Sequence, residues 1–333
     1  MQDYEQSILE QYNLDVNSTR KTRGAILCDT KRGAFLLKEV LVSESRIPAL
    51  CELYEYLKAQ GYERVDSIIL NKEDEYISCT EDGSRYIVKK WFSGRECDVR
   101  KTADILEASG NLAKLHGVMR KELSGEVTVA EPLQDIYLKH DRELKKVRKF
   151  IRNQSPKGEF EFAFLKCFDQ MYQWASAAEE MLRSSGYHRL YEQSVADHCM
   201  IHGEYNYHNV LMKKEGVGTE VEATTNFDKF KRDVQVEDLY YFLRKVMEKH
   251  GWKERLGDNM LNAYSAIRPL TEAEVEYVKL RLVYPEKFWK TASAYYHSNK
   301  AWISAKSIEK LKLSIRQTSE KKRFLEQVFD FHL

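Results

Sequence analysis

The hydrophobic periodicity of the chain changes once, at Trp91-Phe92-Ser93-Gly94. Before this point, apolar residues form short runs separated by turn residues, a pattern typical of antiparallel strands. After it, apolar residues recur every three to four positions over long stretches, which predicts helices. A chain of 333 residues is long enough for two lobes. We therefore predict an α+β, bilobal fold. Its β-rich N-terminal lobe, an antiparallel sheet with one helix, covers residues 1–92, and its mainly helical C-terminal lobe covers residues 93–333.

Turn residues in the first part define a hairpin and further strands around one helix. Apolar runs at residues 24–28 and 34–37 bracket the turn Asp29-Thr30-Lys31-Arg32-Gly33. Between the capping residue Ser43 and Gly61, apolar side chains repeat at helical spacing. More strands are predicted at residues 67–70, 75–79 and 85–90. The helices of the second part are predicted at residues 102–116, 141–152, 162–182, 236–250, 271–282 and 307–331.

Composition and charge argue against several classes of function. The formal net charge is +1, which gives no overall attraction to nucleic acid or to an anionic membrane. No apolar run approaches the roughly 20 residues that span a bilayer, and the acidic residues near the N-terminus disagree with a signal peptide. Six scattered cysteines without a C-x-x-C pair indicate free thiols. We expect synthesis in the cytoplasm, with no nucleic acid and no membrane as partner.

One polar loop carries the clearest chemistry. Residues 201–210 read I-H-G-E-Y-N-Y-H-N-V, and the second strand after this loop ends in Asn226-Phe227-Asp228. Two polar strand ends of this kind bring oxygen ligands side by side, as nucleotide-bound Mg²⁺ requires. In kinases the first loop is H-x-D-x-x-x-x-N, and the second element supplies a metal-binding aspartate. His202, Glu204 and Asn209 have that spacing.

A transition-metal site is an alternative interpretation of the same region. His198, Cys199, His202 and His208 are ligand types that suit zinc, although their spacing matches no common zinc finger. A kinase-type loop already accounts for His202 as a structural histidine.

Kinase-like features also lie on both sides of this loop. Lys38 ends an apolar strand, as a phosphate-pairing lysine does, and Asp238 begins a helix ten residues after Asp228. The chain resembles the aminoglycoside-phosphotransferase-type branch of the protein-kinase-like fold, and more closely the CotS family of bacterial spore coat proteins. The resemblance spans about residues 20–330. Besides the loops, the segments that carry it are residues 91–100, 112–116, 225–230, 284–290 and 301–304.

This resemblance implies a bilobal kinase-like fold, with ATP and Mg²⁺ as the cofactors of an active site. In the family pattern, Lys38 meets the α- and β-phosphates. The hinge that faces the adenine corresponds to the backbone of Lys89, Lys90, Trp91 and Phe92.

The same resemblance assigns roles to the polar loops. Glu204 stands at the position of the catalytic base. Asn209 stands where one metal ligand is expected, and Asn226 or Asp228 where the other is. Two further residues brace the loop rather than act chemically, and these are His202 and Asp238.

Three departures from the family pattern argue against catalysis. Glu204 stands in place of aspartate, and moving a catalytic carboxylate by about 1 Å can cost on the order of 10²-fold in rate. Asn226 replaces a metal-binding aspartate, so Asp228, two residues further along, is the candidate substitute. The N-terminal hairpin has no G-x-G-x-x-G. Glu52 is the helical glutamate nearest the family spacing for pairing with Lys38, but it lies opposite the apolar stripe.

Two functions follow from these observations. The first is a degraded phosphotransferase, a pseudokinase that acts in spore coat assembly, with other spore coat proteins as partners and the coat as its location. The alternative is an active ATP- and Mg²⁺-dependent phosphotransferase on a small-molecule acceptor or a coat component. Lys229, Lys231 and Arg232 follow the second loop and favour an acidic or neutral acceptor.

Overall fold

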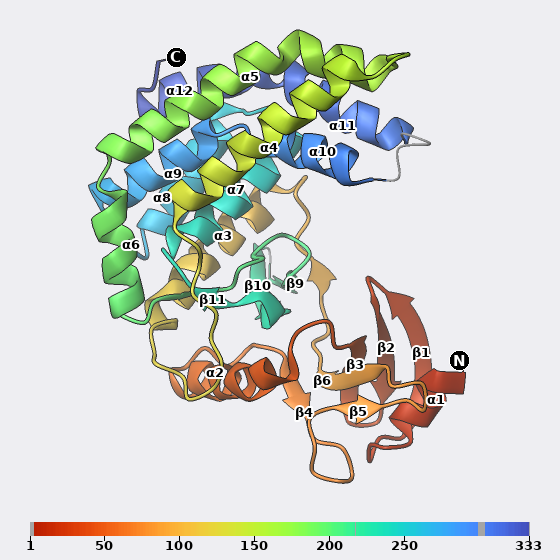
Figure 1. The fold of residues 1–333 in the computed structure, drawn as a ribbon. Coiled ribbons are helices and arrows are strands. Elements are labelled where there is room, and N and C mark those ends of the chain that lie inside the picture. Colours follow the sequence, from red (N-terminus) through yellow and green to blue (C-terminus); the bar gives the residue numbers. More distant parts are fainter. Residues whose placement is uncertain (1–2, 217, 299–303, 333) are drawn as a thin grey trace. The chain divides into compact units, whose positions relative to one another are not determined.

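The computed structural model describes residues 3–216, 218–298 and 304–332. Residues 301–303, which begin the last family-like segment, lie outside the described residues. The chain divides into two compact units (Figure 1). We call residues 1–128, 197–232 and 266–268 the sheet unit, and residues 129–196, 233–265 and 269–333 the helical unit.

The sheet unit begins with an antiparallel sheet in the order β1-β2-β3-β6-β4, with β5 paired to β6. Its strands are β1 (Val16–Thr22), β2 (Ala25–Thr30), β3 (Gly33–Glu39), β4 (Ser67–Ile69), β5 (Ser78–Cys79) and β6 (Arg85–Lys90). The predicted hairpin is present as β2 and β3, which close at the pair Thr30 and Gly33. The sequence did not predict β1, because its residues VNSTRKT are polar and it lies at the sheet edge with little burial.

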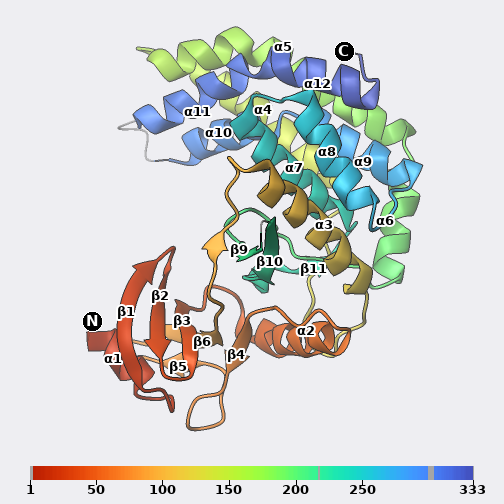
Figure 2. The ribbon, with the colours of Figure 1, turned by 180° about the vertical axis from the view of Figure 1, so that it is seen from behind.

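Both faces of this sheet are covered, which explains why its inner strands read as short apolar runs. On one face, Ile8 and Leu9 around the end of α1 (Asp3–Leu9) pack with Phe35 and Val88. On the other face, Ile47 and Cys51 of α2 (Ile47–Ala59) pack with Val40 and Ile87. The short helix η1 (Glu44–Arg46) precedes α2. Figures 1 and 2, which are views from opposite directions, show α1 and α2 next to this sheet.

The remaining parts of the sheet unit carry the kinase-type loops. A helix, α3 (Thr102–Val118), accompanies a small sheet in the order β10-β9-β7 and the pair β8 and β11. A parallel bridge between Val65 and Thr224 connects this part to the N-terminal sheet region. The elements are β7 (Arg95–Glu96), β8 (Met200–Ile201), β9 (Val210–Glu215), β10 (Gly218–Thr224), η2 (Phe227–Lys229) and β11 (Lys231–Arg232).

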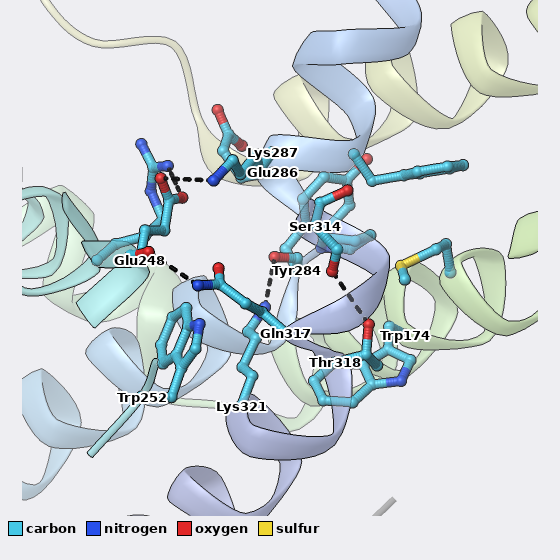
Figure 3. Close-up of a pocket in the computed structure, with 14 residues that line it drawn as sticks. Trp174, Glu248, Trp252, Tyr284, Glu286, Lys287, Ser314, Gln317, Thr318 and Lys321 are labelled. Carbon is cyan, nitrogen blue, oxygen red and sulfur yellow. Dashed lines mark hydrogen bonds and ion pairs between the residues drawn. The ribbon is translucent and has the colours of Figure 1, made fainter. Parts of the chain in front are cut away.

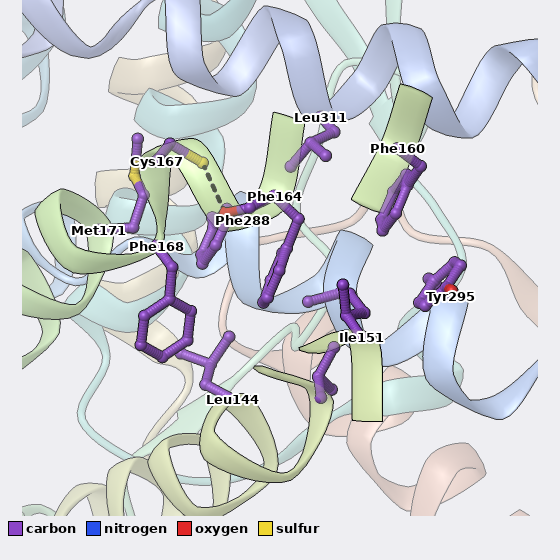
Figure 4. Close-up of a cluster of buried hydrophobic side chains, with 12 residues drawn as sticks. Leu144, Ile151, Phe160, Phe164, Cys167, Phe168, Met171, Phe288, Tyr295 and Leu311 are labelled. Carbon is purple, nitrogen blue, oxygen red and sulfur yellow. Dashed lines mark hydrogen bonds between the residues drawn. The ribbon is translucent and has the colours of Figure 1, made fainter. Parts of the chain in front are cut away.

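The helical unit is built from long amphipathic helices around an aromatic core (Figure 4). Phe160, Phe164 and Phe168 repeat every four residues and therefore share one face of α5. Phe164 stacks on Phe288 with ring centroids 5.1 Å apart, and Phe160 stacks on Tyr295 at 4.4 Å. The helices are α4 (Leu133–Asn153), α5 (Glu159–Ser184), α6 (Tyr187–Ala196), α7 (Val236–His250), α8 (Glu254–Ser265), α9 (Glu272–Val283), α10 (Glu286–His297), α11 (Ala305–Arg316) and α12 (Thr318–Phe329).

One helix prediction is wrong. Residues 307–331 do not form a single helix, because the chain breaks at Gln317 between α11 and α12. The two helices pack on different partners: α11 lies against α5 and α10, and α12 lies against α8 and α9. Among the described residues, no helix combines the length and apolar character needed to cross a membrane.

Candidate functional site

The kinase-type loop between β8 and β9 is held by backbone geometry that only glycine satisfies easily. Gly203 has φ +80°, and a Cβ at this position would overlap the carbonyl oxygen of Lys229 and lie 2.8 Å from its carbonyl carbon. His202 is fully buried, and its Nε2 lies 2.9 Å from the carbonyl oxygen of Thr225. Its ring also packs against Phe227. His202 therefore connects the first loop to the second, as expected of a structural residue.

Glu204, at the position of the catalytic base, is partly exposed. Its Oε1 lies 3.2 Å from Nζ of Lys229, so the carboxylate is held by a surface ion pair. Its carbonyl oxygen accepts hydrogen bonds from the side-chain amides of Asn206 and Asn209, each at 3.0 Å. The carboxylate could accept a proton, and the loop backbone around it is well fixed.

Asn209 and Asn226, the two amides at predicted metal positions, are bonded to each other. Nδ2 of Asn226 donates to Oδ1 of Asn209 at 2.9 Å. The backbone N–H of Asn226 donates to Oδ2 of Asp66 at 3.1 Å, and Oδ1 of Asn226 accepts from Lys38 at 3.3 Å. Asn226 adopts φ +63°, a left-handed conformation that asparagine tolerates better than most residues. The amide oxygens of both residues already accept protein hydrogen bonds.

Two lysines hold the carboxylate of Asp228. Its Oδ2 lies 2.5 Å from Nζ of Lys38 on β3, and its Oδ1 lies 2.9 Å from Nζ of Lys89 on β6. Lys89 is fully buried and also lies 3.1 Å from Oδ2 of Asp66 and 3.3 Å from the hydroxyl of Tyr54. We call Lys38, Lys89, Asp66 and Asp228 the lysine–aspartate cluster. It contains two positive and two negative charges.

The pKa shifts in this cluster follow from its charges. Burial alone would lower the pKa of Lys89, but the negative charge of Asp66, with further contributions from Tyr54 and Asp228, raises it well above the ordinary lysine value. Burial would raise the pKa of Asp228, but Lys89 and Lys38 hold it well below the ordinary aspartate value. Lys89 and Asp228 are therefore charged at neutral pH and compensate each other.

This arrangement does not fit a divalent cation. A cation needs several free oxygen ligands. Both oxygens of Asp228 are instead bound to ammonium groups, and the side chains of Asn209 and Asn226 bind each other. In the part of the chain that the structure describes, no group of three or more His, Cys, Asp or Glu side chains is placed to hold a metal.

The residues of the alternative zinc site have separate partners. Nδ1 of His208 lies 2.6 Å from Glu96, which also pairs with Arg23 in the turn between β1 and β2. His198 lies 3.9 Å from Glu122, and His202 lies against Thr225. The structure therefore gives the zinc interpretation no support.

The predicted hinge positions lie at the end of β6. The backbone N–H of Trp91 donates to the carbonyl oxygen of Ala34 at 2.9 Å, which continues the pairing with β3. The side chain of Lys90 is exposed, and Trp91 and Phe92 are half-buried. Contact of this backbone with an adenine stays a prediction. Asp238 lies buried in the first turn of α7, in the helical unit.

Sequence reasoning missed two residues of the cluster, Asp66 and the side chain of Lys89. The resemblance assigns Lys89 a role only through its backbone. A signal was present: Ile87 and Lys89 are two residues apart on β6 and therefore share a face of the sheet. A lysine on the face that carries a buried isoleucine needs an acidic partner. Val65-Asp66 directly precedes the strand that pairs with β6.

Glu52 does not pair with Lys38. It accepts hydrogen bonds from the backbone N–H and the hydroxyl of Ser124, at 2.7 and 2.6 Å, and lies 3.3 Å from Lys121. Asp228 is thus the acidic partner of Lys38, in place of a helical glutamate.

The overall structure is similar to that of several phosphotransferases. An aminoglycoside phosphotransferase from Alicyclobacillus acidocaldarius has a TM-score of 0.84 at 16% identity, with 98% of this chain and 95% of that chain covered. A microcompartment-associated aminopropanol kinase has a TM-score of 0.67 at 12% identity, with 97% of each chain covered. Spectinomycin phosphotransferase APH(9)-Ia, solved with ADP and spectinomycin, has a TM-score of 0.65 at 11% identity, with 96% and 99% covered. The predicted kinase-like fold is confirmed.

Sequence comparison identifies the family. No curated protein matches the chain. The sequence model of the family described as "Spore coat putative kinase YutH" matches residues 5–328. This match covers nearly the whole chain and confirms the resemblance to CotS-type spore coat proteins. The chain belongs to this spore coat kinase family.

Proposed function

We propose that this chain acts in spore coat assembly as a pseudokinase, a kinase-like protein whose site does not carry out metal-assisted phosphoryl transfer. Its family supports the coat context. The observation that carries the proposal is the position of Asp228, whose two carboxylate oxygens are each bound by a lysine. Its partners in this role are other spore coat proteins.

The charges of the site support this proposal. Phosphoryl transfer in this fold depends on metal ions that neutralise the phosphates and on an acid that positions the attacking group. At the predicted metal positions, Asn226 is neutral and the charge of Asp228 is already compensated. Lys89 cannot leave Asp228 without losing part of its own compensation inside the protein, because burying an unpaired charge is costly.

Lys38 already binds Asp228 and Asn226, so a phosphate would meet an ammonium group whose charge is largely compensated. The side chain of Lys38 is about one-fifth exposed and its Nζ lies 2.5 Å from the Asp228 carboxylate. A phosphate would have to compete with an ion pair that is already formed. This competition weakens the nucleotide contact that the family pattern assigns to Lys38.

The experiment is thermal unfolding of the purified chain with ATP, in the presence and absence of Mg²⁺, combined with a phosphate-release assay. A ligand present at 100 times its Kd adds roughly 2.7 kcal/mol to the free energy of unfolding, which is readily measured. We expect no Mg²⁺-dependent shift of the midpoint and no phosphate release. Lys38→Ala and Asp228→Ala serve as matched variants.

A Mg²⁺-dependent shift together with ATP turnover, both lost in Lys38→Ala and in Asp228→Ala, would contradict the proposal. It would favour an active phosphotransferase acting on a small molecule or a coat component. A shift by ATP alone, without turnover, would be compatible with a pseudokinase that binds nucleotide without metal.

A further inference from the structure

The helical unit contains a small cavity that none of the residues of the candidate site line. It lies among α5, α7, α10, α11 and α12 (Figure 3) and has a volume of about 50 Å³. A cavity needs roughly 10–15 Å³ to hold one water molecule, so this one has room for on the order of four water-sized groups. Trp174 and Trp252 contribute to its walls, together with the charged side chains of Arg244, Glu248, Glu286, Lys287 and Lys321.

The amine of Lys321 lies between the two tryptophans. Its Nζ is 5.1 Å from the ring centroid of Trp174 and 5.6 Å from that of Trp252. Within the described part of the chain, this amine makes one hydrogen bond, to the carbonyl oxygen of Tyr284, which is long at 3.5 Å. Among the described residues, no carboxylate lies within ion-pair distance of this nitrogen. Lys321 therefore lacks a counter-charge.

The nearby carboxylates are engaged by other cations. Oε1 of Glu248 lies 2.6 Å from Arg244 and its Oε2 lies 3.3 Å from Lys287. Oε1 of Glu286 lies 3.0 Å from Lys290, which does not line the cavity. Three positive side chains line the cavity against two negative ones. The wall therefore carries an excess of positive charge.

A second observation concerns Arg244, another cation of the cavity wall. The side chain of Arg244 is only 8% exposed, and among the described residues its buried Nε has no hydrogen-bond partner. Leaving a buried donor unpaired is costly, so such atoms are rare in folded proteins. Arg244 lines the same cavity as Lys321. Arg244 and Lys321 are two cationic side chains of one cavity. Oε2 of Glu286, which also lines it, is likewise buried without a hydrogen-bond partner among the described residues and lies 4.0 Å from Arg281.

We propose that this cavity binds a small carboxylate anion of the size of formate or acetate. Its oxygens accept hydrogen bonds from Lys321 and Arg244, and its carbon atoms lie against the tryptophan rings. The volume restricts the ligand to about four non-hydrogen atoms, so a bulky carboxylate is excluded. This site is independent of the proposed function of the kinase-type loops.

The charge of Lys321 makes this binding depend on pH. Burial, with a smaller contribution from Arg244, lowers the pKa of Lys321 to about 7, although Glu248 and Glu286 act in the opposite direction. The charged side chains that line the cavity are Arg244 and Glu248 from α7 and Glu286 and Lys287 from α10, besides Lys321 itself. A bound carboxylate favours the protonated amine, so binding takes up a proton. Affinity is then highest below pH 7 and falls as the amine loses its proton above it.

The test replaces sodium chloride by sodium acetate at constant ionic strength and follows tryptophan fluorescence and the thermal unfolding midpoint. We expect a saturable change in both, with an apparent Kd about tenfold weaker at about pH 8 than at about pH 6. Formate should bind, and pivalate, which is too large for the cavity, should not. Lys321→Met should abolish the response. Lys322→Met, one residue along the same helix, should retain it.

The proposal is overturned if acetate acts like chloride on the unmodified chain, or if Lys321→Met responds as the unmodified chain does. Should Lys321→Met fail to fold by circular dichroism, the pH and size series on the unmodified chain decide. Acetate binding that does not change between pH 6 and 8, or equal binding of pivalate, would then overturn it.

Discussion

Lys89 is a buried charged residue at the centre of the candidate site. A lysine without solvent exposure would lose its charge unless carboxylates compensate it, and Asp66 and Asp228 do so at 3.1 and 2.9 Å. Asp66 also accepts the backbone N–H of Asn226. A single buried carboxylate therefore holds both the lysine and the second polar loop in position. The cluster acts as a structural link within the sheet unit.

This role predicts a specific pattern of stability. Lys89→Met should lower the free energy of unfolding by about 3–5 kcal/mol, because it leaves Asp66 buried without a counter-charge. The double variant Lys89→Met/Asp66→Asn removes both charges and keeps an oxygen for the N–H of Asn226. We expect it to recover most of the loss, which urea unfolding at neutral pH would measure.

The single variant Asp66→Asn completes the double-mutant cycle. If the effects of Lys89→Met and Asp66→Asn simply add, the two residues are not coupled and the cluster does not have the role assigned to it. If the double variant is more stable than the sum of the two single effects predicts, the assigned role is supported.

The residues of the site were predictable to different degrees. The positions of Glu204, Asn209 and Asn226 follow from a local spacing, so the sequence alone indicated them. Their partners do not follow from local patterns. The contact between Lys38 and Asp228 joins residues 190 positions apart, and the bond between Asn209 and Asn226 depends on how β9 and β10 pair. Their assigned roles in metal binding and catalysis stay predictions.

At the scale of elements, the loop after β8 depends on Gly203. The left-handed backbone and the closeness of Lys229 both exclude a side chain there. Gly61, after α2, has a nearly identical φ of +83°, but a Cβ at Gly61 would meet nothing within 4 Å. An added side chain would therefore suffer backbone strain at both glycines, but steric overlap only at Gly203.

We expect Gly203→Ala to lower the free energy of unfolding by about 2–4 kcal/mol, the sum of strain and overpacking. Gly61→Ala should cost only about 1 kcal/mol, from the positive φ alone. Chemical denaturation of both variants gives the comparison. Equal costs would mean that Lys229 moves aside freely and that the loop tolerates a side chain.

Element prediction succeeded where a single periodicity was sufficient. The helix expected at residues 141–152 from its apolar spacing lies within α4, which begins earlier, at Leu133, and Leu144, Val147 and Ile151 are buried. Element prediction failed where contacts with distant parts of the chain determine whether an element forms or where it ends. Nothing in the apolar pattern of residues 307–331 shows that α11 and α12 pack on different helices. The polar strand β1 likewise forms because β2 offers an edge for pairing, not because of its own hydrophobicity.

At the scale of the molecule, the kinase-type loops and the N-terminal sheet belong to one compact unit. The predicted lobe border after residue 92 falls within that unit, and it stays a prediction as a boundary between lobes. Contacts such as Lys89 with Asp228, and Arg46 with the carbonyl oxygen of Phe230 at 2.5 Å, hold this unit together. The site thus contributes to the integrity of the fold, whatever its chemistry.

This link gives a test of the proposed role in the coat. If the chain acts through its folded surface, then coat assembly should follow the stability of the fold and not the chemistry of the catalytic position. Variants of the adjacent residues Gly203 and Glu204 distinguish the effect of fold stability from that of the catalytic carboxylate. Glu204→Ala removes the carboxylate at the catalytic-base position but breaks only a surface ion pair with Lys229, which is worth about 0–1 kcal/mol. Gly203→Ala leaves that carboxylate in place and disturbs the fold.

In sporulating cells that make this chain, Glu204→Ala should therefore be incorporated into the coat at the level of the unmodified chain, with unchanged coat protein composition. Gly203→Ala should be reduced or lost, because a destabilised chain is depleted in cells. Gel analysis of coat extracts and quantification of the chain would measure both. The opposite result, a coat defect in Glu204→Ala equal to that of a deletion while Gly203→Ala assembles normally, would require the carboxylate itself, and with it an active phosphotransferase.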